Sequence, residues 1–255
     1  MAIVMSITNQ KGGVGKTTTA VNLAYYLAKS GKKTLLIDFD PQGNATSGLG
    51  FDKQGLSLTM ADVVMGSNGL DEVVLSTKYN NFFVAPSTPC LADVEVQLAQ
   101  AEKRFSRLKN AIEASQVNYD VIIVDCPPSL SLLTVNGLIA AKYVLLPVQA
   151  EFFALEGLGQ LLETMKLIRR GMNPTLDLLG VLPTMMDSRT TLSGQVYEEI
   201  KKHFPGKVFN NVIPRNVRLA EAPSHGLPIG VYDKFSRGAR AYKAFAKEVL
   251  DRVSI

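Results

Sequence analysis

The chain of 255 residues contains no tryptophan, two cysteines and two histidines. Cys90 and Cys126 have neither a C-x-x-C spacing nor a nearby histidine, so the sequence indicates neither a zinc site nor a disulfide framework. We expect both to be buried, reduced thiols. No apolar run approaches the roughly 18 to 20 residues that a membrane-spanning helix needs, and the N-terminus lacks the pattern of a secretory signal. These absences predict a cytoplasmic protein.

The net charge is only +4, but it is unevenly distributed. From Thr184 to the end there are 12 Lys and Arg against 7 Asp and Glu, an excess of +5, whereas the preceding residues sum to −1. A basic C-terminal quarter favours a polyanionic partner on one face, although a solvated surface explains five charges nearly as well.

Apolar runs of strand length alternate with amphipathic segments of helix length. The runs span residues 2–8, 33–38, 82–87, 119–125, 143–148 and 176–184, and helical spacing is found over 17–30, 91–115 and 155–170. Continuous apolar runs suit strands buried on both faces, and strand-helix repetition favours right-handed parallel crossovers. The sequence therefore predicts an α/β fold with a mostly parallel, twisted sheet flanked by helices on both faces, as a single domain over 1–255.

Residues 10–18, QKGGVGKTT, lie between the first predicted strand and helix and nearly match the phosphate-binding pattern G-x-x-x-x-G-K-[ST]. Gln10 stands at the first glycine position. Backbone N–H groups of such a loop surround a phosphate at a helix N-terminus. Its members are Gly12, Gly13, Val14 and Gly15, with Lys16 for the β- and γ-phosphates, Thr17 for Mg²⁺ and Thr18 for the α-phosphate.

Carboxylates follow two of the predicted strands. Asp125 ends the apolar run 119–125, where a metal's water shell would offset the cost of burying it. Asp38 ends the second run and Asp40 follows two residues later, so the two lie on one side if the strand continues that far. Since Cys126 and two prolines follow Asp125, no glutamate is placed there as a base, and Asp38 or Asp40 must position the attacking water. Each aspartate has an alternative use as a turn cap.

The strings KGGVGKTT, DFDPQGNAT and VDCPPS together resemble the deviant-Walker ATPases, and among these the ParA/Soj chromosome- and plasmid-partition proteins. Residues 151–162 and 212–229 are similar to that branch too, so the resemblance covers about 2–247. It implies ATP and Mg²⁺ as cofactors, slow ATP hydrolysis stimulated by a ParB-type partner, a homodimer when ATP is bound, and binding to non-specific double-stranded DNA on the nucleoid.

The resemblance also assigns roles to residues. Lys11, the additional lysine of the loop, would reach the phosphates held by the other subunit, as an arginine finger does; the alternative is a solvated surface lysine. Asp40 would serve hydrolysis with Lys11 and Lys16, and Asp38, Asp125 and Thr17 the Mg²⁺ site. Pro214 and Asn216 would flank adenine. Arg189 and Arg218 would contact DNA phosphates, extended by Lys201, Lys202, Arg215, Lys234, Arg237 and Arg240, with Arg215 alternatively serving the nucleotide or the dimer interface.

Two other classes share this nucleotide chemistry. A MinD-type division-site regulator ends in a basic amphipathic helix that lies on lipid. The last residues here, AFAKEVLDRVSI, are short and of mixed charge, so we expect a packed terminal helix and no stable membrane association. An iron-sulfur ATPase needs bridging cysteines that Cys90 and Cys126 do not provide. Because the first strand begins at residue 2, no N-terminal helix-turn-helix domain and no operator binding are expected.

Overall fold

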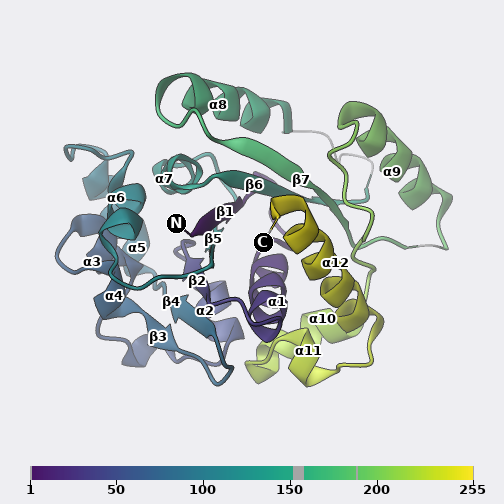
Figure 1. Cartoon of the computed structure of the whole chain (residues 1–255), viewed down its shortest axis with the longest axis horizontal. Helices are drawn as coiled ribbons and strands as arrows, with labels where there is room; N and C mark the ends of the chain where they lie inside the picture. Colours follow the sequence, from purple (N-terminus) through teal and green to yellow (C-terminus); the bar gives the residue numbers. More distant parts are fainter. Residues whose placement is uncertain (1, 152–157, 188, 255) are drawn as a thin grey trace.

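The computed structural model describes residues 2–151, 158–187 and 189–254. Its centre is a 7-stranded sheet in the order β3-β4-β2-β5-β1-β6-β7 (Figure 1). The strands are β1 (Ile3–Ile7), β2 (Thr34–Asp38), β3 (Leu75–Ser76), β4 (Phe82–Ala85), β5 (Val121–Asp125), β6 (Tyr143–Gln149) and β7 (Asp177–Thr184). They pair in parallel except β3, which is antiparallel to β4. The predicted mostly parallel α/β fold is confirmed.

Helices follow nearly every strand. They are α1 (Lys16–Lys29), α2 (Asn44–Gly48), α3 (Met60–Met65), α4 (Leu70–Val73), α5 (Cys90–Leu98), α6 (Arg107–Ala114), α7 (Leu132–Ala140), α8 (Leu158–Gly171), α9 (Thr191–His203), α10 (Val217–Glu221), α11 (Ile229–Tyr232) and α12 (Arg237–Val253), with 3₁₀ turns η1 (Lys53–Gly55) and η2 (Ala222–His225). The helix predicted over 155–170 matches α8, and its first residues, 155–157, lie outside the described part of the chain.

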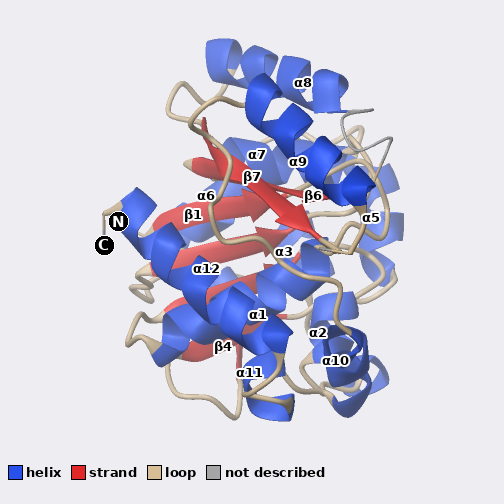
Figure 2. Ribbon diagram, turned by 90° about the vertical axis from the view of Figure 1, so that its right-hand side faces the viewer, coloured by secondary structure: helices blue, strands red, loops and turns tan. Residues whose placement is uncertain are grey.

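The sheet separates two hydrophobic cores. Alternate residues of each central strand point to opposite faces, so Val4 and Ile122 join the core beneath α3 to α9, while Met5 and Ile123 join the core beneath α1, α2 and α10 to α12. Figure 2 shows α1 and α12 crossing the same face of the sheet. Burial on both faces explains why the strands read as uninterrupted apolar runs.

The terminal helix α12 packs as predicted. Tyr242, Phe245 and Val249 are buried in the core with α1, and the Tyr242 hydroxyl lies 3.0 Å from Thr19 Oγ1 of α1. Arg252 stacks over the Phe209 ring, 3.9 Å from its centroid. The apolar face of α12 is thus used within the fold. Among the described helices, none is long and apolar enough to cross a membrane.

The amphipathic segment 91–115 is interrupted, contrary to the single helical stretch that its spacing favours. It forms α5 and α6, with Lys103 between them in the left-handed region at φ 56°. Asn136 of α7 accounts for the break: its side-chain amide donates to Arg104 O at 2.7 Å, and its Oδ1 accepts from Leu108 N at 3.4 Å. A side chain from another helix therefore supplies partners that a continuous helix would have made internally.

One of the two cysteine predictions is wrong. Cys126 is buried, but Cys90 is exposed. Cys90 begins α5, and the core-facing positions of that helix are taken by Leu91, Val94 and Leu98. Cys90 lies four residues before Val94, at the border of this stripe and at the first residue of the helix, where it is exposed.

Helix α7 approaches the sheet closely at Gly137. A Cβ there would lie 2.7 Å from Cys126 Sγ and 3.4 Å from Ser6 Oγ. We expect Gly137→Ala to lower the free energy of unfolding by about 1 to 3 kcal/mol through overpacking, measured by urea denaturation. Gly159→Ala on α8, where a Cβ meets nothing within 4 Å, is the matched control and should be neutral or stabilising by up to about 1 kcal/mol. Equal stability of the two variants would contradict the tight contact.

Candidate nucleotide site

The loop between β1 and α1 has the conformation that a phosphate site needs. Gly13 and Gly15 adopt φ of 74° and 88°, the left-handed region that favours glycine. Val14 is buried, and its carbonyl accepts a hydrogen bond of 2.8 Å from Thr184 Oγ1 at the end of β7. The loop is thus shaped by its glycines and fixed from a strand two places away in the sheet.

The two lysines of the loop point to different places. Lys16 is only 6% exposed, and its Nζ donates to the Lys11 carbonyl at 2.9 Å. Burial lowers the pKa of Lys16, opposed by the nearby charges of Asp125 and Asp40. The Lys11 side chain is 38% exposed, and its Nζ lies 3.9 Å from Glu151 Oε2. Lys16 therefore points into the interior, whereas the partly exposed Lys11 side chain points away from it toward Glu151.

The predicted carboxylates meet at the ends of β2 and β5. These strands are neighbours, and their register pairs Asp38 with Asp125. Asp38 is fully buried and accepts hydrogen bonds from Thr46 N at 2.8 Å and Thr46 Oγ1 at 2.7 Å. Burial nevertheless raises the pKa of Asp38 to about 6. Asp40, also buried, accepts from Gln42 N at 2.9 Å.

Asp125 fits a metal site. It is 0% exposed, and no residue in the described part of the chain donates a hydrogen bond to either of its oxygens. Burial raises its pKa well above the ordinary value, Asp38 adds to the rise, and the nearby Thr17 hydroxyl and Lys16 oppose it. Hydrated Mg²⁺ would supply the missing donors and charge. Asp125, Thr17 and Asp38 are the residues that would hold it.

The predicted adenine loop lies against the end of β7. Met186 forms a β-bridge with Pro214, and Arg215 N donates to Met186 O at 2.9 Å. Asn216 Oδ1 is buried without a hydrogen-bond partner among the described residues. Such an amide oxygen could accept a hydrogen bond from the exocyclic amino group of adenine. This fits the sequence prediction that Pro214 and Asn216 flank adenine.

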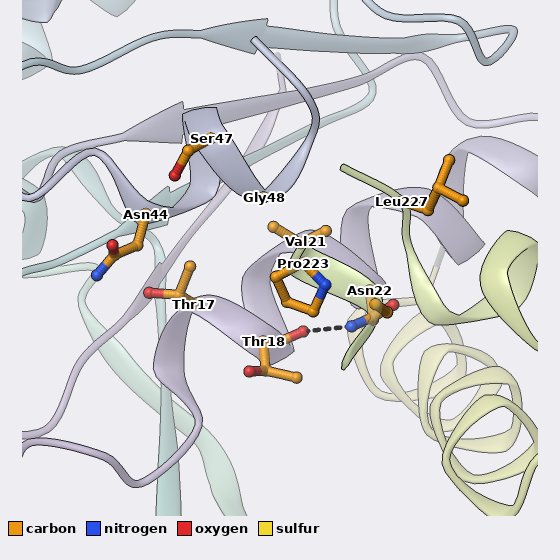
Figure 3. Close-up of a pocket in the computed structure, with 10 residues that line it drawn as sticks. Thr17, Thr18, Val21, Asn22, Asn44, Ser47, Gly48, Pro223 and Leu227 are labelled. Carbon is orange, nitrogen blue, oxygen red and sulfur yellow. Dashed lines mark hydrogen bonds between the residues drawn. The ribbon is translucent and has the colours of Figure 1, made fainter. Parts of the chain in front are cut away.

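A cavity of about 300 Å³ adjoins the start of α1. In Figure 3, Thr17 and Thr18 face it from α1, Asn44 and Ser47 from α2, and Pro223 from η2. The dashed bond from Asn22 Nδ2 to Thr18 O, 2.8 Å long, fixes the first turn of α1 below it. The cavity extends the phosphate site toward the segment that carries Arg218.

The two predicted DNA contacts belong to different parts of the fold, the start of α9 and the helix α10, which Figure 1 labels. Arg189 precedes α9, and its guanidinium donates twice to Asp187, at 2.9 and 2.7 Å. Arg218 on α10 donates to Glu221 at 2.9 Å. Both side chains are well exposed, at 84% and 51%.

Sequence reasoning missed three residues of the site: Thr46, Thr184 and Glu151. Thr46 lies inside the string DFDPQGNAT, eight residues after Asp38. The sequence does not indicate their contact, because it forms only when α2 folds back toward the end of β2. Thr184 ends the apolar run 176–184, and nothing in that run indicates its hydrogen bond to the phosphate loop. Glu151 begins the string EFFALEGLGQLL, of which residues 152–157 lie outside the described part of the structure.

A glycine loop between a parallel strand and a helix, a buried lysine and two strand-end carboxylates define a P-loop nucleotide-binding protein. The comparisons narrow this class. A family model described as an AAA domain matches residues 2–178. The chain is 53% identical over 249 residues to the sporulation initiation inhibitor protein Soj of Bacillus subtilis, covering 98% of each. It is 47% identical over 252 residues to the chromosome-partitioning ATPase Soj of Treponema pallidum, covering 99% of this chain and 98% of the relative.

The chain belongs to the Soj/ParA family of chromosome-partitioning ATPases. Solved structures agree on the fold: cobyrinic acid a,c-diamide synthase from Mycobacterium smegmatis, with bound ADP and magnesium, superposes with a TM-score of 0.88 at 36% identity over 100% of this chain and 96% of that one. The MinD-type alternative is less supported, because a MinD from Pyrococcus horikoshii, at a TM-score of 0.80 and 24% identity, shares the fold alone.

Asp125 should destabilise the protein when Mg²⁺ and nucleotide are withheld. Since its pKa is raised above the ordinary 3.8, the folded state loses stability as pH rises from about 4 and the carboxylate must ionise unpaired. Asp125→Asn should therefore raise the free energy of unfolding at pH 7 by about 1 to 3 kcal/mol, with little change at pH 4. Urea denaturation across this pH range measures it.

Asp177→Asn, at the half-exposed start of β7, controls for the loss of one carboxylate. In Asp125→Asn, Mg²⁺ should no longer add to the thermal stabilisation given by ADP. An Asp125→Asn protein that is less stable than the wild type at pH 7 would contradict the buried, unpaired carboxylate.

Proposed function

We propose that this chain, acting as one ATPase domain, is an ATP-driven partition switch. ATP with Mg²⁺ would close two subunits face to face, the dimer would bind DNA without reading its sequence, and a ParB-type partner would stimulate slow hydrolysis. The observation that carries the proposal is the division between a buried lysine and an outward lysine on one phosphate loop. Family membership supports the cellular role.

Within one subunit, the loop N–H groups and Lys16 would bind the phosphates. Thr17, Asp38 and Asp125 would hold Mg²⁺, which neutralises phosphate charge when bound. Asp40, buried two residues beyond Asp38, would orient the attacking water. Thr46 holds Asp38 through two hydrogen bonds, so the metal-side carboxylate is fixed before ligand arrives.

Lys11 has little to add in its own subunit, because Lys16 already occupies the interior. Its exposed side chain can instead reach phosphates presented by a second subunit. A cation supplied across an interface stabilises charge that develops on the phosphoryl oxygens, and it makes ATP bind the dimer better than the monomer. The dimer is then both the hydrolytic form and the form selected by ATP.

Arg189 and Arg218 would bind the phosphate backbone of DNA and hold the dimer on the nucleoid. Their ion pairs with Asp187 and Glu221 are exposed, and exposed pairs contribute little, so exchange for phosphate costs little. Backbone contacts alone make binding independent of sequence and steeply dependent on salt. Stable membrane association is not part of the proposal, since the apolar face of α12 is buried in the fold.

The two lysines should fail differently on mutation. Lys16→Ala should weaken ATP binding at least about tenfold, because it removes a charge-assisted contact within the subunit. Lys11→Ala should leave ATP binding by the monomer intact and lower hydrolysis about 100-fold or more. Isothermal titration with ATP and a phosphate-release assay separate the two effects. A Lys11→Ala protein that hydrolyses ATP at the wild-type rate would refute action across the interface.

The DNA contacts are tested apart from the ATPase. Arg189→Ala combined with Arg218→Ala should weaken ATP-dependent binding to unrelated duplexes equally and flatten the dependence of affinity on salt. Gel shifts in ATP, ADP and no nucleotide measure this, with Arg169→Ala on α8 as a matched control for removing an exposed arginine. Unchanged affinity at low salt would exclude these arginines as the DNA contacts.

A further inference from the structure

Glu151, two residues after β6, faces cations from two separate loops. Its Oε2 lies 3.9 Å from Lys11 Nζ of the phosphate loop, and its Oε1 lies 3.6 Å from Arg215 Nη2 of the adenine loop. Gln149 at the end of β6 also donates its side-chain amide to Oε1. One carboxylate therefore bridges the two loops that flank the candidate nucleotide.

The contact bears directly on the reach of Lys11. A Lys11 side chain paired with Glu151 of its own chain is held beside its own loop, whose backbone is further fixed by Asn9 Oδ1, which accepts from Lys11 N at 3.0 Å. To contact a second subunit, Lys11 must give up Glu151. The pairing within a subunit and the pairing between subunits thus compete for the same ammonium group.

Arg215 makes that exchange possible at low cost. When Lys11 leaves, Glu151 keeps a cationic partner, so its carboxylate is not left without a counter-charge. Arg215 is held in place independently by its backbone bond to Met186 O, 2.9 Å long. Glu151 therefore restrains Lys11, and Arg215 weakens that restraint because it shares the charge of the Glu151 carboxylate.

We propose that Glu151 and Arg215 are positioning residues that set how readily Lys11 becomes available to a second subunit, and hence the ATP concentration at which the dimer forms. The inference rests on the proposed role of Lys11 across the interface and adds its regulation. The three side chains are 38%, 46% and 58% exposed for Lys11, Glu151 and Arg215. Pairs of this exposure contribute modestly, so the shift in the dimerisation midpoint is about two- to fivefold.

The test is dimerisation by sedimentation velocity across a titration of a non-hydrolysable ATP analogue with Mg²⁺, without DNA. Glu151→Gln keeps the size of the side chain and removes its charge, and it should lower the midpoint. Arg215→Met should raise it, because Glu151 then holds Lys11 alone. The double variant should follow Glu151→Gln, since Arg215 acts only through the carboxylate. Glu163→Gln on α8, which removes an exposed pair with Lys166, is the control and should match the wild type.

A salt series adds a second readout, because the difference between Glu151→Gln and the wild type should shrink as the pairs are screened. Shifts of the single variants in the same direction, or a double variant that follows Arg215→Met, would overturn the inference. So would a Glu151→Gln midpoint equal to that of the wild type. Lys11→Ala separates the two levels: if it dimerises normally in this assay and also hydrolyses ATP at the wild-type rate in the phosphate-release assay, the proposed function fails with the inference; if either is impaired, only the inference is at stake.

Discussion

The burial of Asp125 beside Asp38 is the constraint on which the rest of the site depends. Both carboxylates lie at 0% exposure on adjacent strands, and burial raises the pKa of each. A carboxylate taken out of water without a partner is costly, so the fold must hold these groups by other means. It does so with two hydrophobic cores, one on each face of the sheet. These cores fix the register of β2 and β5 whatever the charge at the ends of the two strands.

The fold followed from patterns that act locally. Six apolar runs form strands at the predicted places. Strands buried on both faces are apolar at every position, so each of them appears in the sequence as one continuous run. The misses came from tertiary contacts: Asn136 divides 91–115 into two helices, and β3 (Leu75–Ser76) is too short to have a pattern of its own. Cys90 shows the same limit at the level of one residue, because its exposure depends on which face of α5 meets the core.

The site divides in the same way. The glycine loop, Lys16 and the strand-end aspartates could be predicted, because a parallel sheet brings the carboxyl ends of neighbouring strands together. The residues that hold these groups in place, Thr46 and Thr184, could not be predicted. Thr46 reaches Asp38 only when α2 turns back over β2, and Thr184 reaches Val14 across 170 positions of sequence. Nothing in the spacing of Lys11 and Glu151, 140 residues apart by their numbers, indicated that they pair.

The polar groups of the molecule fall into two kinds, and the difference explains how one ligand can change several contacts. The partly exposed Lys11 and the exposed Arg189 and Arg218 each have a carboxylate of the same chain nearby, and such pairs exchange at little cost. The buried oxygens of Asp125 and of Asn216 have no partner in the described residues, and only a ligand that carries donors can satisfy them. In the proposed switch, affinity would come from the buried groups, whereas the exposed cations would supply contacts that can be made and broken. A switch requires that combination, because a ligand shifts an equilibrium only by binding one state better than the other.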